Sequence, residues 1–230
     1  MNRRCEMVTL RSTFERQLKT LNNDLLRLAE LVETQLVEAV RALQQHDFEA
    51  ARRIEAFDAT INRLRYEIEE QCYTLLALQQ PNAGDLRRIV AAVSIATNLE
   101  RMGDHAAGIA RIALRTESLP AAVHLPLFTD MARLAAENLH QATIAFENGD
   151  AALARQVVRR DDEVDALHKR VYDYLIKTMT ENSAAVEYAT LLLWVSHDIE
   201  RFADRVSNIC ERIVYVITGV LFEPRSSTAL

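Results

Sequence analysis

The sequence has few residues that interrupt helices. Only five glycines and four prolines occur among its 230 residues. Both residue types are unfavourable inside a helix, so their scarcity favours long helices. Hydrophobic residues make up 49% of the chain and charged residues 26%. That balance is ordinary for a globular protein and argues against intrinsic disorder.

Cysteine is also scarce. The three cysteines, Cys5, Cys72 and Cys210, are odd in number and widely spaced, and no C-x-x-C motif occurs. This pattern argues against a disulfide framework and against a thiolate zinc site. It fits the reducing conditions of a cytoplasm.

Long apolar runs and excess positive charge are missing too. The longest apolar run, 213–222, is about half as long as a membrane-spanning helix requires. The stretch MNRRCEMVTLRSTFERQ has basic residues but no apolar signal core behind them. A net charge of −6 gives no basic surface for a nucleic acid. We therefore expect a soluble, cytoplasmic protein that binds no nucleic acid, and docking onto a membrane protein stays open.

Apolar residues recur every three or four positions along most of the chain, which predicts helices. Asp47 and Asp150 are suitable N-caps, and Gly149 is a suitable helix stop. Six helices are predicted: one containing Leu21 to Leu43, one from Asp47 to about Gln80, one after the Pro81–Gly84 turn to about Arg115, one ending at Glu147, one from Asp150 to about Glu181, and one from the Asn182–Ser183 turn to near Gly219.

The second half of the sequence repeats the first. At an offset of 103, Asp47 matches Asp150 and Asp58 matches Asp161; past the Pro81 turn the offset becomes 100. The segment TESLPAAVHLP separates the two halves. The sequence therefore predicts an all-α fold of two pseudo-symmetric three-helix bundles, with repeats at 13–118 and 121–222.

Acidic pairs four residues apart stand at matching positions of the two repeats. Glu100 and Asp104 form one pair, and Glu200 and Asp204 form its counterpart. By helical periodicity both pairs face away from the apolar stripe of their own helix. Outward acids usually form a solvated surface, but repetition favours a selected feature. Carboxylates on adjacent helices can share a cation, and oxygen ligands suit Mg²⁺, Ca²⁺, Mn²⁺ or iron.

The helix before each of these pairs carries acids as well. Asp161 and Asp165 are four residues apart in the fifth predicted helix, and Asp58 and Asn62 occupy the matching positions in the second. Periodicity allows these acids to approach the later pairs but does not by itself bring them together.

The duplicated motif resembles that of the PhoU family of phosphate-transport regulators. The stretches ERMGDH and ERFADRVSNICE each lie near the end of a three-helix repeat, and the resemblance covers essentially the whole chain. It implies a fold of two three-helix bundles and surface metal clusters with iron, zinc, manganese or magnesium. It implies two groups of ligands, the first comprising Asp161, Asp165, Glu200, Asp204 and Asn208, and the second comprising Asp58, Glu100 and Asp104.

The first repeat departs from this pattern. Asn62 replaces an acid, and Gly108 stands where the second repeat has Asn208. We therefore expect the first-repeat site to bind metal more weakly than the second, or not at all.

The resemblance also implies a function without catalysis. The protein is expected to be a cytoplasmic negative regulator of phosphate uptake and of the phosphate-starvation response. It would act as an adaptor between the ATPase subunit of a phosphate ABC transporter and a phosphate sensor histidine kinase, and it would form a homodimer.

Two alternatives remain open at this point. A ferritin-like di-iron enzyme needs inward Glu-x-x-His motifs, and Glu137-x-x-His140 is the one full match, with Asp165-x-x-His168 a near one. A metal-free helical adaptor with acidic faces for a basic partner is the other. Nucleophilic catalysis is disfavoured, because no serine lies in a nucleophile elbow and no glycine-rich loop could hold a nucleotide phosphate.

Overall fold

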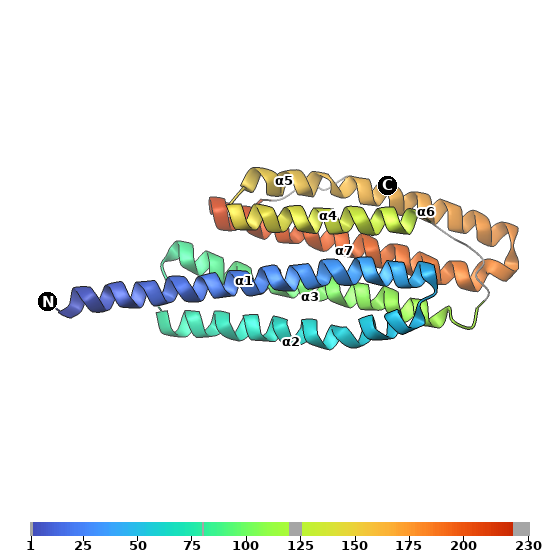
Figure 1. The fold of residues 1–230 in the computed structure, drawn as a ribbon. Helices are drawn as coiled ribbons and strands as arrows, with labels where there is room; N and C mark the ends of the chain where they lie inside the picture. Colours follow the sequence, from blue (N-terminus) through green and yellow to red (C-terminus); the bar gives the residue numbers. More distant parts are fainter. Residues whose placement is uncertain (1, 80, 120–125, 223–230) are drawn as a thin grey trace.

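The chain forms long helices that run along one common direction (Figure 1). The computed structural model describes the backbone of residues 2–79, 81–119 and 126–222, and the side chains in these ranges from residue 12 onward except that of Gln79. The helices are α1 (Asn2–Gln45), α2 (Phe48–Gln79), α3 (Ala83–Arg115), α4 (Leu127–Asn148), α5 (Ala151–Arg159), α6 (Asp161–Glu181) and α7 (Val186–Thr218), with a short 3₁₀ turn, η1 (Ser183–Ala185), before α7.

Several helix ends form as the sequence predicts. The Asp150 side chain accepts hydrogen bonds from the backbone N–H groups of Ala152 and Leu153, both at 2.9 Å. Gly149 ends α4 with φ at 63°, in the left-handed region where a side chain would be strained. Asp47 accepts a bond from the N–H of Ala50 at 2.9 Å, so it caps α2 as predicted. These residues fix where α2 and α5 begin and where α4 ends.

The structure differs from the predicted helices at one place. The fifth predicted helix is divided at Arg160 into α5 and α6, because one residue in a turn conformation separates them. Asp161 to Glu163 then form an acidic first turn of α6, which the helix dipole favours. The first helix, for which the sequence predicts no definite start, begins at Asn2. Part of the predicted boundary, residues 120–125, lies outside the described residues.

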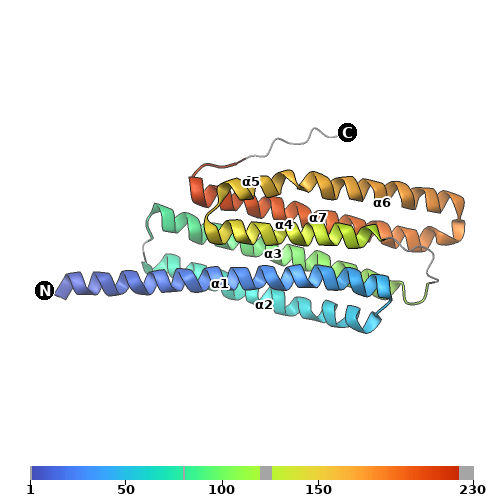
Figure 2. The ribbon, with the colours of Figure 1, turned by 45° about the horizontal axis from the view of Figure 1, so that its top comes forward.

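The helices form two three-helix bundles, which confirms the predicted fold class. Helices α1 to α3 make the first bundle, and α4, the α5–α6 pair and α7 make the second; the bundles lie side by side in Figures 1 and 2. They meet through α3 against α7 and α1 against α4. Buried residues from both bundles form a single hydrophobic core.

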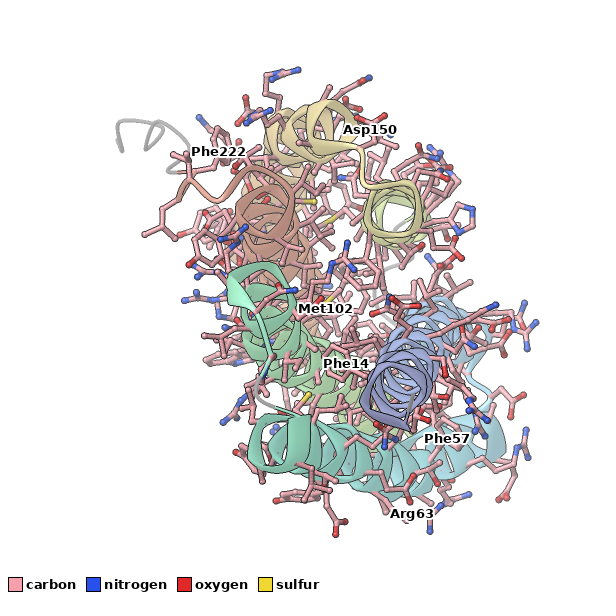
Figure 3. All side chains as sticks on the ribbon, turned by 90° about the vertical axis from the view of Figure 1, so that its left-hand side faces the viewer. Phe14, Phe57, Arg63, Met102, Asp150 and Phe222 are labelled. Carbon is pink, nitrogen blue, oxygen red and sulfur yellow. The ribbon has the colours of Figure 1, made fainter. Side chains whose placement is uncertain are left out.

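The interior and the periphery separate clearly in the end-on view of Figure 3. Phe14 and Met102 are buried, whereas Arg63 and Asp150 lie exposed at the edge of the molecule. None of the helices in the described ranges combines the length and the apolar character that a membrane crossing requires. Helices α3 and α7, which carry the duplicated acidic motif, pack against each other where the two bundles meet.

Candidate metal centres

The four motif acids are only partly exposed to solvent. The exposed fraction of the side chain is 17% for Glu100 and 37% for Asp104, and 23% for Glu200 and 40% for Asp204. The prediction that they face outward is therefore wrong in part. Periodicity located them correctly off the core stripe of their own helix, but it could not show that the preceding helix covers that flank.

The second-repeat cluster lies where α6 packs against α7. Asp161 Oδ2 accepts a hydrogen bond from the Ser207 hydroxyl at 3.0 Å, which ties the start of α6 to α7. Glu200 Oε2 is completely buried and has no hydrogen-bond partner. Asn208 lies one turn beyond Asp204 on α7 and is half-buried. Four acids and one amide from two helices thus share one flank of the second bundle.

Burial and mutual repulsion disfavour ionisation of these acids. Burial raises the pKa of Glu200 to about 7, and the charge of Asp204 adds to the effect. Burial likewise raises the pKa of Asp161 to about 6, although the bond from Ser207 opposes the shift. The pKa of Asp165 is raised by burial and then by Asp204. Asp161 and Glu200 thus interact electrostatically with Asp165 and Asp204 across the α6–α7 flank.

The first-repeat cluster lies in the matching place between α2 and α3. Asp58 Oδ2 accepts a hydrogen bond from the Asn62 amide at 3.0 Å, while Asp58 Oδ1 is buried without a partner. The pKa of Asp58 is raised by burial and then by the charge of Asp104. The pKa of Glu100 is raised by burial, then by Asp104 and more weakly by Asp58. The charges of Asp58 and Asp104 thus both act on Glu100 across the α2–α3 flank.

Arginines compensate more of the negative charge in the first cluster than in the second. Arg111 lowers the pKa of Asp58, and both Arg101 and Arg65 lower the pKa of Glu100. In the second cluster, Arg201 is the arginine that lowers the pKa of Glu200. A cation gains less where guanidinium groups already neutralise the carboxylates. This difference supports the predicted ranking of the two sites.

Small residues set how closely the helices approach at the first cluster. A Cβ on Gly103 would lie 3.0 Å from two side-chain carbons of Ile61, so α2 and α3 pack closely between Glu100 and Asp104. Gly108 has a different neighbour: a Cβ there would lie 2.9 Å from Asp198 Oδ2. The glycine at 108 therefore makes room for a residue of the second repeat.

Both clusters have the chemistry that a hard cation needs. Each contains a buried carboxylate oxygen without a hydrogen bond, Asp58 Oδ1 in one and Glu200 Oε2 in the other. Such an orphaned oxygen costs free energy unless a donor or a cation meets it. Across the described part of the chain, no three carboxylate, imidazole or thiol groups already converge at metal-binding distance. Binding would therefore draw the side chains together.

Sequence reasoning did not assign three neighbouring side chains to the second-repeat site. Ser207 holds Asp161, and two histidines, His168 and His197, lie at one end of the acidic row. His197 Nδ1 is 3.5 Å from Glu200 Oε2. The repeat distinguishes the two histidines, because Arg65 matches His168 and Thr97 matches His197, and neither has an imidazole.

The ferritin-like motif is not arranged for catalysis. Glu137 pairs with Arg133 at 2.7 Å and with Arg160 at 3.7 Å. His140 is exposed and lies 3.7 Å from Glu33 at the surface. Since a di-iron site needs these groups inside the bundle, the structure disfavours that alternative.

Comparison with known proteins gives consistent similarities along the chain. The family model described as "PhoU domain" matches twice, at residues 25–113 and 128–213. A phosphate-specific transport system accessory protein PhoU homolog of Clostridium acetobutylicum is 35% identical over 91% of this chain and 96% of its own length. The crystal structure of PhoU from Streptococcus pneumoniae superposes with a TM-score of 0.86 at 33% identity, covering 92% of this chain and 100% of that one. PhoU from Pseudomonas aeruginosa superposes with a TM-score of 0.84 at 31% identity, over 90% and 100% of the two chains.

Proposed function

The chain belongs to the PhoU family, and from this membership we propose that it is an accessory, regulatory protein of a phosphate transport system. The observation that carries the proposal is the similarity, over nearly the whole chain, to relatives whose names assign them that role. The duplicated acidic motif stands in both matched domains. Those relatives are named as accessory proteins, so we propose a regulator without enzymatic activity of its own.

The regulatory role we propose is negative. When phosphate is plentiful, the protein would restrain both phosphate uptake and the phosphate-starvation response. It would do so in the cytoplasm as an adaptor between the ATPase subunit of the phosphate ABC transporter and the sensor histidine kinase. Contact with the membrane would occur only through these partners, and the protein would act as a homodimer.

Metal binding is the second part of the proposal. Asp161, Asp165, Glu200 and Asp204, assisted by Asn208, would hold one cation group at the α6–α7 flank. Asp58, Glu100 and Asp104 would hold a weaker one at the α2–α3 flank. Iron, zinc, manganese or magnesium would neutralise the clustered carboxylates and fix the two flanking helices together. The orphaned oxygens of Asp58 and Glu200 support this part.

Gene deletion tests the regulatory role. In phosphate-rich medium, the deletion strain should take up more phosphate and express its starvation genes, and the wild-type gene should reverse both effects. Unchanged uptake together with an unchanged response would refute the proposal.

Pull-down with the transporter ATPase subunit and with the sensor kinase tests the adaptor role. Light scattering tests the homodimer, and a result that shows only monomer would refute it.

A rescue experiment separates metal binding from regulation. A strain expressing Glu200→Ala with Asp204→Ala should contain a folded protein without metal at the second-repeat site. If this variant rescues the deletion fully, metal at the second-repeat site is not required for regulation. If it fails to rescue while the matched variant Glu100→Ala with Asp104→Ala succeeds, the second-repeat site is required for regulation.

A further inference from the structure

A groove runs between α1 and α2 of the first bundle. It encloses about 290 Å³ and extends along α1 from Leu31 to Arg41, which corresponds to about 15 Å at 1.5 Å per residue. Its large apolar side chains are Leu31, Ile54 and Phe57. Figure 3 shows Phe57 at the edge of the molecule. Since the acidic clusters lie between α2 and α3 and between α6 and α7, the groove is separate from both.

A buried amide fixes the two walls of the groove relative to each other. Gln35 of α1 lines the groove, is 4% exposed and donates a hydrogen bond from Nε2 to the backbone carbonyl of Ile54 on α2 at 3.3 Å. The other end of the same amide faces α3, because Gln35 Oε1 lies 3.4 Å from where a Cβ on Gly103 would be. The width of the groove is therefore set by contacts within the first bundle.

The charged residues of the groove are positive in balance. They are Glu38, Arg41 and Arg53. Glu38 and Arg41 form an ion pair with each other on α1. Arg53 on α2 is exposed, and among the residues that the structure describes none forms an ion pair with it. The whole chain has a net charge of −6, so this groove has the opposite sign, and a negatively charged group complements it.

The second repeat has different residues at two of these positions. Leu153 stands where the first repeat has Ala50, and its larger side chain packs against the core. Gln156, which has no charge, stands where the first repeat has Arg53. The second repeat therefore fills with its own leucine the space that Ala50 leaves open, and it does not repeat the positive charge.

An ion pair also crosses the matching surface of the second repeat. Glu137 of α4 lies 3.7 Å from Arg160, which follows α5. These residues match Thr34 and Phe57, which line opposite walls of the groove in the first repeat. One repeat thus joins the two walls with its own side chains, and the other leaves them apart. This difference indicates a role for the groove that belongs to the first repeat alone.

The dimensions of the groove suit a helix with one or two inserted side chains. A length of about 15 Å corresponds to roughly three turns of helix. The volume lies just below the range of about 300–1,000 Å³ that is usual for small-molecule and cofactor sites. Val37 is 43% exposed and shares a face of α1 with Thr34 and Arg41, so it adds apolar surface beside the groove.

We propose that the α1–α2 groove binds an amphipathic helix of a partner protein, which inserts an apolar side chain beside Phe57 and pairs a carboxylate with Arg53. An amphipathic helix that lies in an apolar groove is a common mode of recognition between proteins. The inference rests on the proposed adaptor role and adds to it a docking surface and the chemistry of the partner segment.

Binding of the full-length protein to the purified transporter ATPase subunit and to the detergent-solubilised sensor kinase tests the proposal. Ala50→Leu, which copies Leu153, fills the groove and should weaken one of the two complexes by at least about tenfold. Arg53→Glu should weaken the same complex by at least about tenfold, because it places like charges together. Two controls carry the same negative charge elsewhere: Arg63→Glu at an exposed position on α2, and Gln156→Glu at the matching position of the second repeat. Both should stay within about twofold of the wild type.

Crosslinking identifies the segment that occupies the groove. Phe57→benzoylphenylalanine, activated by light in the complex, should form a crosslink to a helical segment of the partner. Mass spectrometry of the crosslinked peptide should find Asp or Glu within one helical turn of the linked residue. A linked segment without an acid would overturn the proposed pairing with Arg53.

The possible results separate this inference from the proposed function. If the wild type binds neither protein, the adaptor role fails and this inference fails with it. If it binds either one and the groove variants weaken neither complex, this inference alone fails. If the groove variants instead reduce self-association in light scattering, the groove binds a second copy of this chain and the inference is overturned. Circular dichroism checks folding, and Arg53→Gln, at an exposed position, is the second variant if Ala50→Leu does not fold.

Discussion

His105 of α3 and Asp198 of α7 join the two repeats, with His105 Nδ1 3.0 Å from Asp198 Oδ1. Three residues after His105, Gly108 leaves the space that the other carboxylate oxygen occupies, because a Cβ there would lie 2.9 Å from Asp198 Oδ2. The second repeat has Asn208 at the matching position. The absence of a potential metal ligand at 108 therefore has a steric cause in the packing between repeats.

We expect Gly108→Ala to be less stable than helix propensity alone would suggest. In an unobstructed helix this change stabilises by roughly 0.5–1 kcal/mol. Here the new methyl group must displace the Asp198 carboxylate and weaken its bond to His105, and a hydrogen bond to a charged group contributes about 1.5–3 kcal/mol. Urea unfolding should therefore show little gain or a net loss.

A double-mutant cycle isolates this contact. In an Asp198→Ala background the obstruction is gone, so Gly108→Ala should stabilise the protein in the ordinary way. The effect of Gly108→Ala should differ between the two backgrounds by at least about 1 kcal/mol. Equal effects in both backgrounds would show that Gly108 is not required by Asp198.

The stability of the metal-free protein should fall as the pH rises toward neutrality. The pKa of Glu200 is about 7 in the folded state, against a reference value of 4.5. Between these values the folded state keeps a proton that the unfolded state has released, so its contribution to stability is present below about pH 4.5 and is lost as the pH approaches 7. Chemical denaturation in EDTA from pH 5 to 7.5 measures this loss.

Glu200→Gln provides the control for that titration. The variant cannot ionise at this position, so its stability relative to the wild type should increase from pH 5 to 7.5 by roughly 1–3 kcal/mol. Asp130→Asn, at an exposed position on α4, should show no such trend. A constant difference between Glu200→Gln and the wild type across the range would mean that Glu200 titrates normally.

The fold was predictable because it depends on local patterns that repeat. Helical periodicity, the cap at Asp150 and the stop at Gly149 were each readable from neighbouring residues. The offset between repeats then gave the two-bundle architecture. The break at Arg160 was not predictable, since the matching stretch of the first repeat continues as one helix through α2.

The candidate ligands could be named from the sequence, but their environment could not be predicted. The sequence placed Glu200 and Asp204 on one face of a helix, and the family resemblance added Asp161 and Asp165. The sequence could not show how far α6 covers that face. Burial there raises the pKa of Glu200 and leaves its Oε2 without a hydrogen-bond partner. The contact of Gly108 with Asp198 was equally hidden, because it depends on how the two repeats meet.

Two leucines test whether the bundles share one core. Leu139 of α4 is fully buried and borders an internal space lined by residues of α1, α3 and α7, among them Leu25 and Leu99. Leu139→Ala should therefore destabilise the protein by about 2–5 kcal/mol in a single cooperative unfolding transition. The matched change Leu78→Ala, at a side chain that is 70% exposed, should stay within about 0.5 kcal/mol. Separate transitions in the Leu139 variant would show that the bundles unfold independently.

Metal should stabilise the second repeat more than the first. A cation that binds only the folded state adds RT ln(1 + [L]/Kd), or about 2.7 kcal/mol at one hundred times Kd. Glu200→Gln with Asp204→Asn should remove most of the zinc-dependent rise in melting temperature, and Glu100→Gln with Asp104→Asn should remove less.

The same variants carry a second signature, because the clustered carboxylates repel one another when no cation is present. In EDTA at pH 7.5, the second-repeat variant should therefore melt above the wild type, and saturating zinc should reverse that order. The reversal follows from one physical cause: burial makes the ionised acids unfavourable until a cation compensates them. Equal losses of zinc stabilisation in the two variants would contradict the ranking of the sites. If zinc, manganese and magnesium all leave the melting temperature of the wild type unchanged, the acids have a purely structural role.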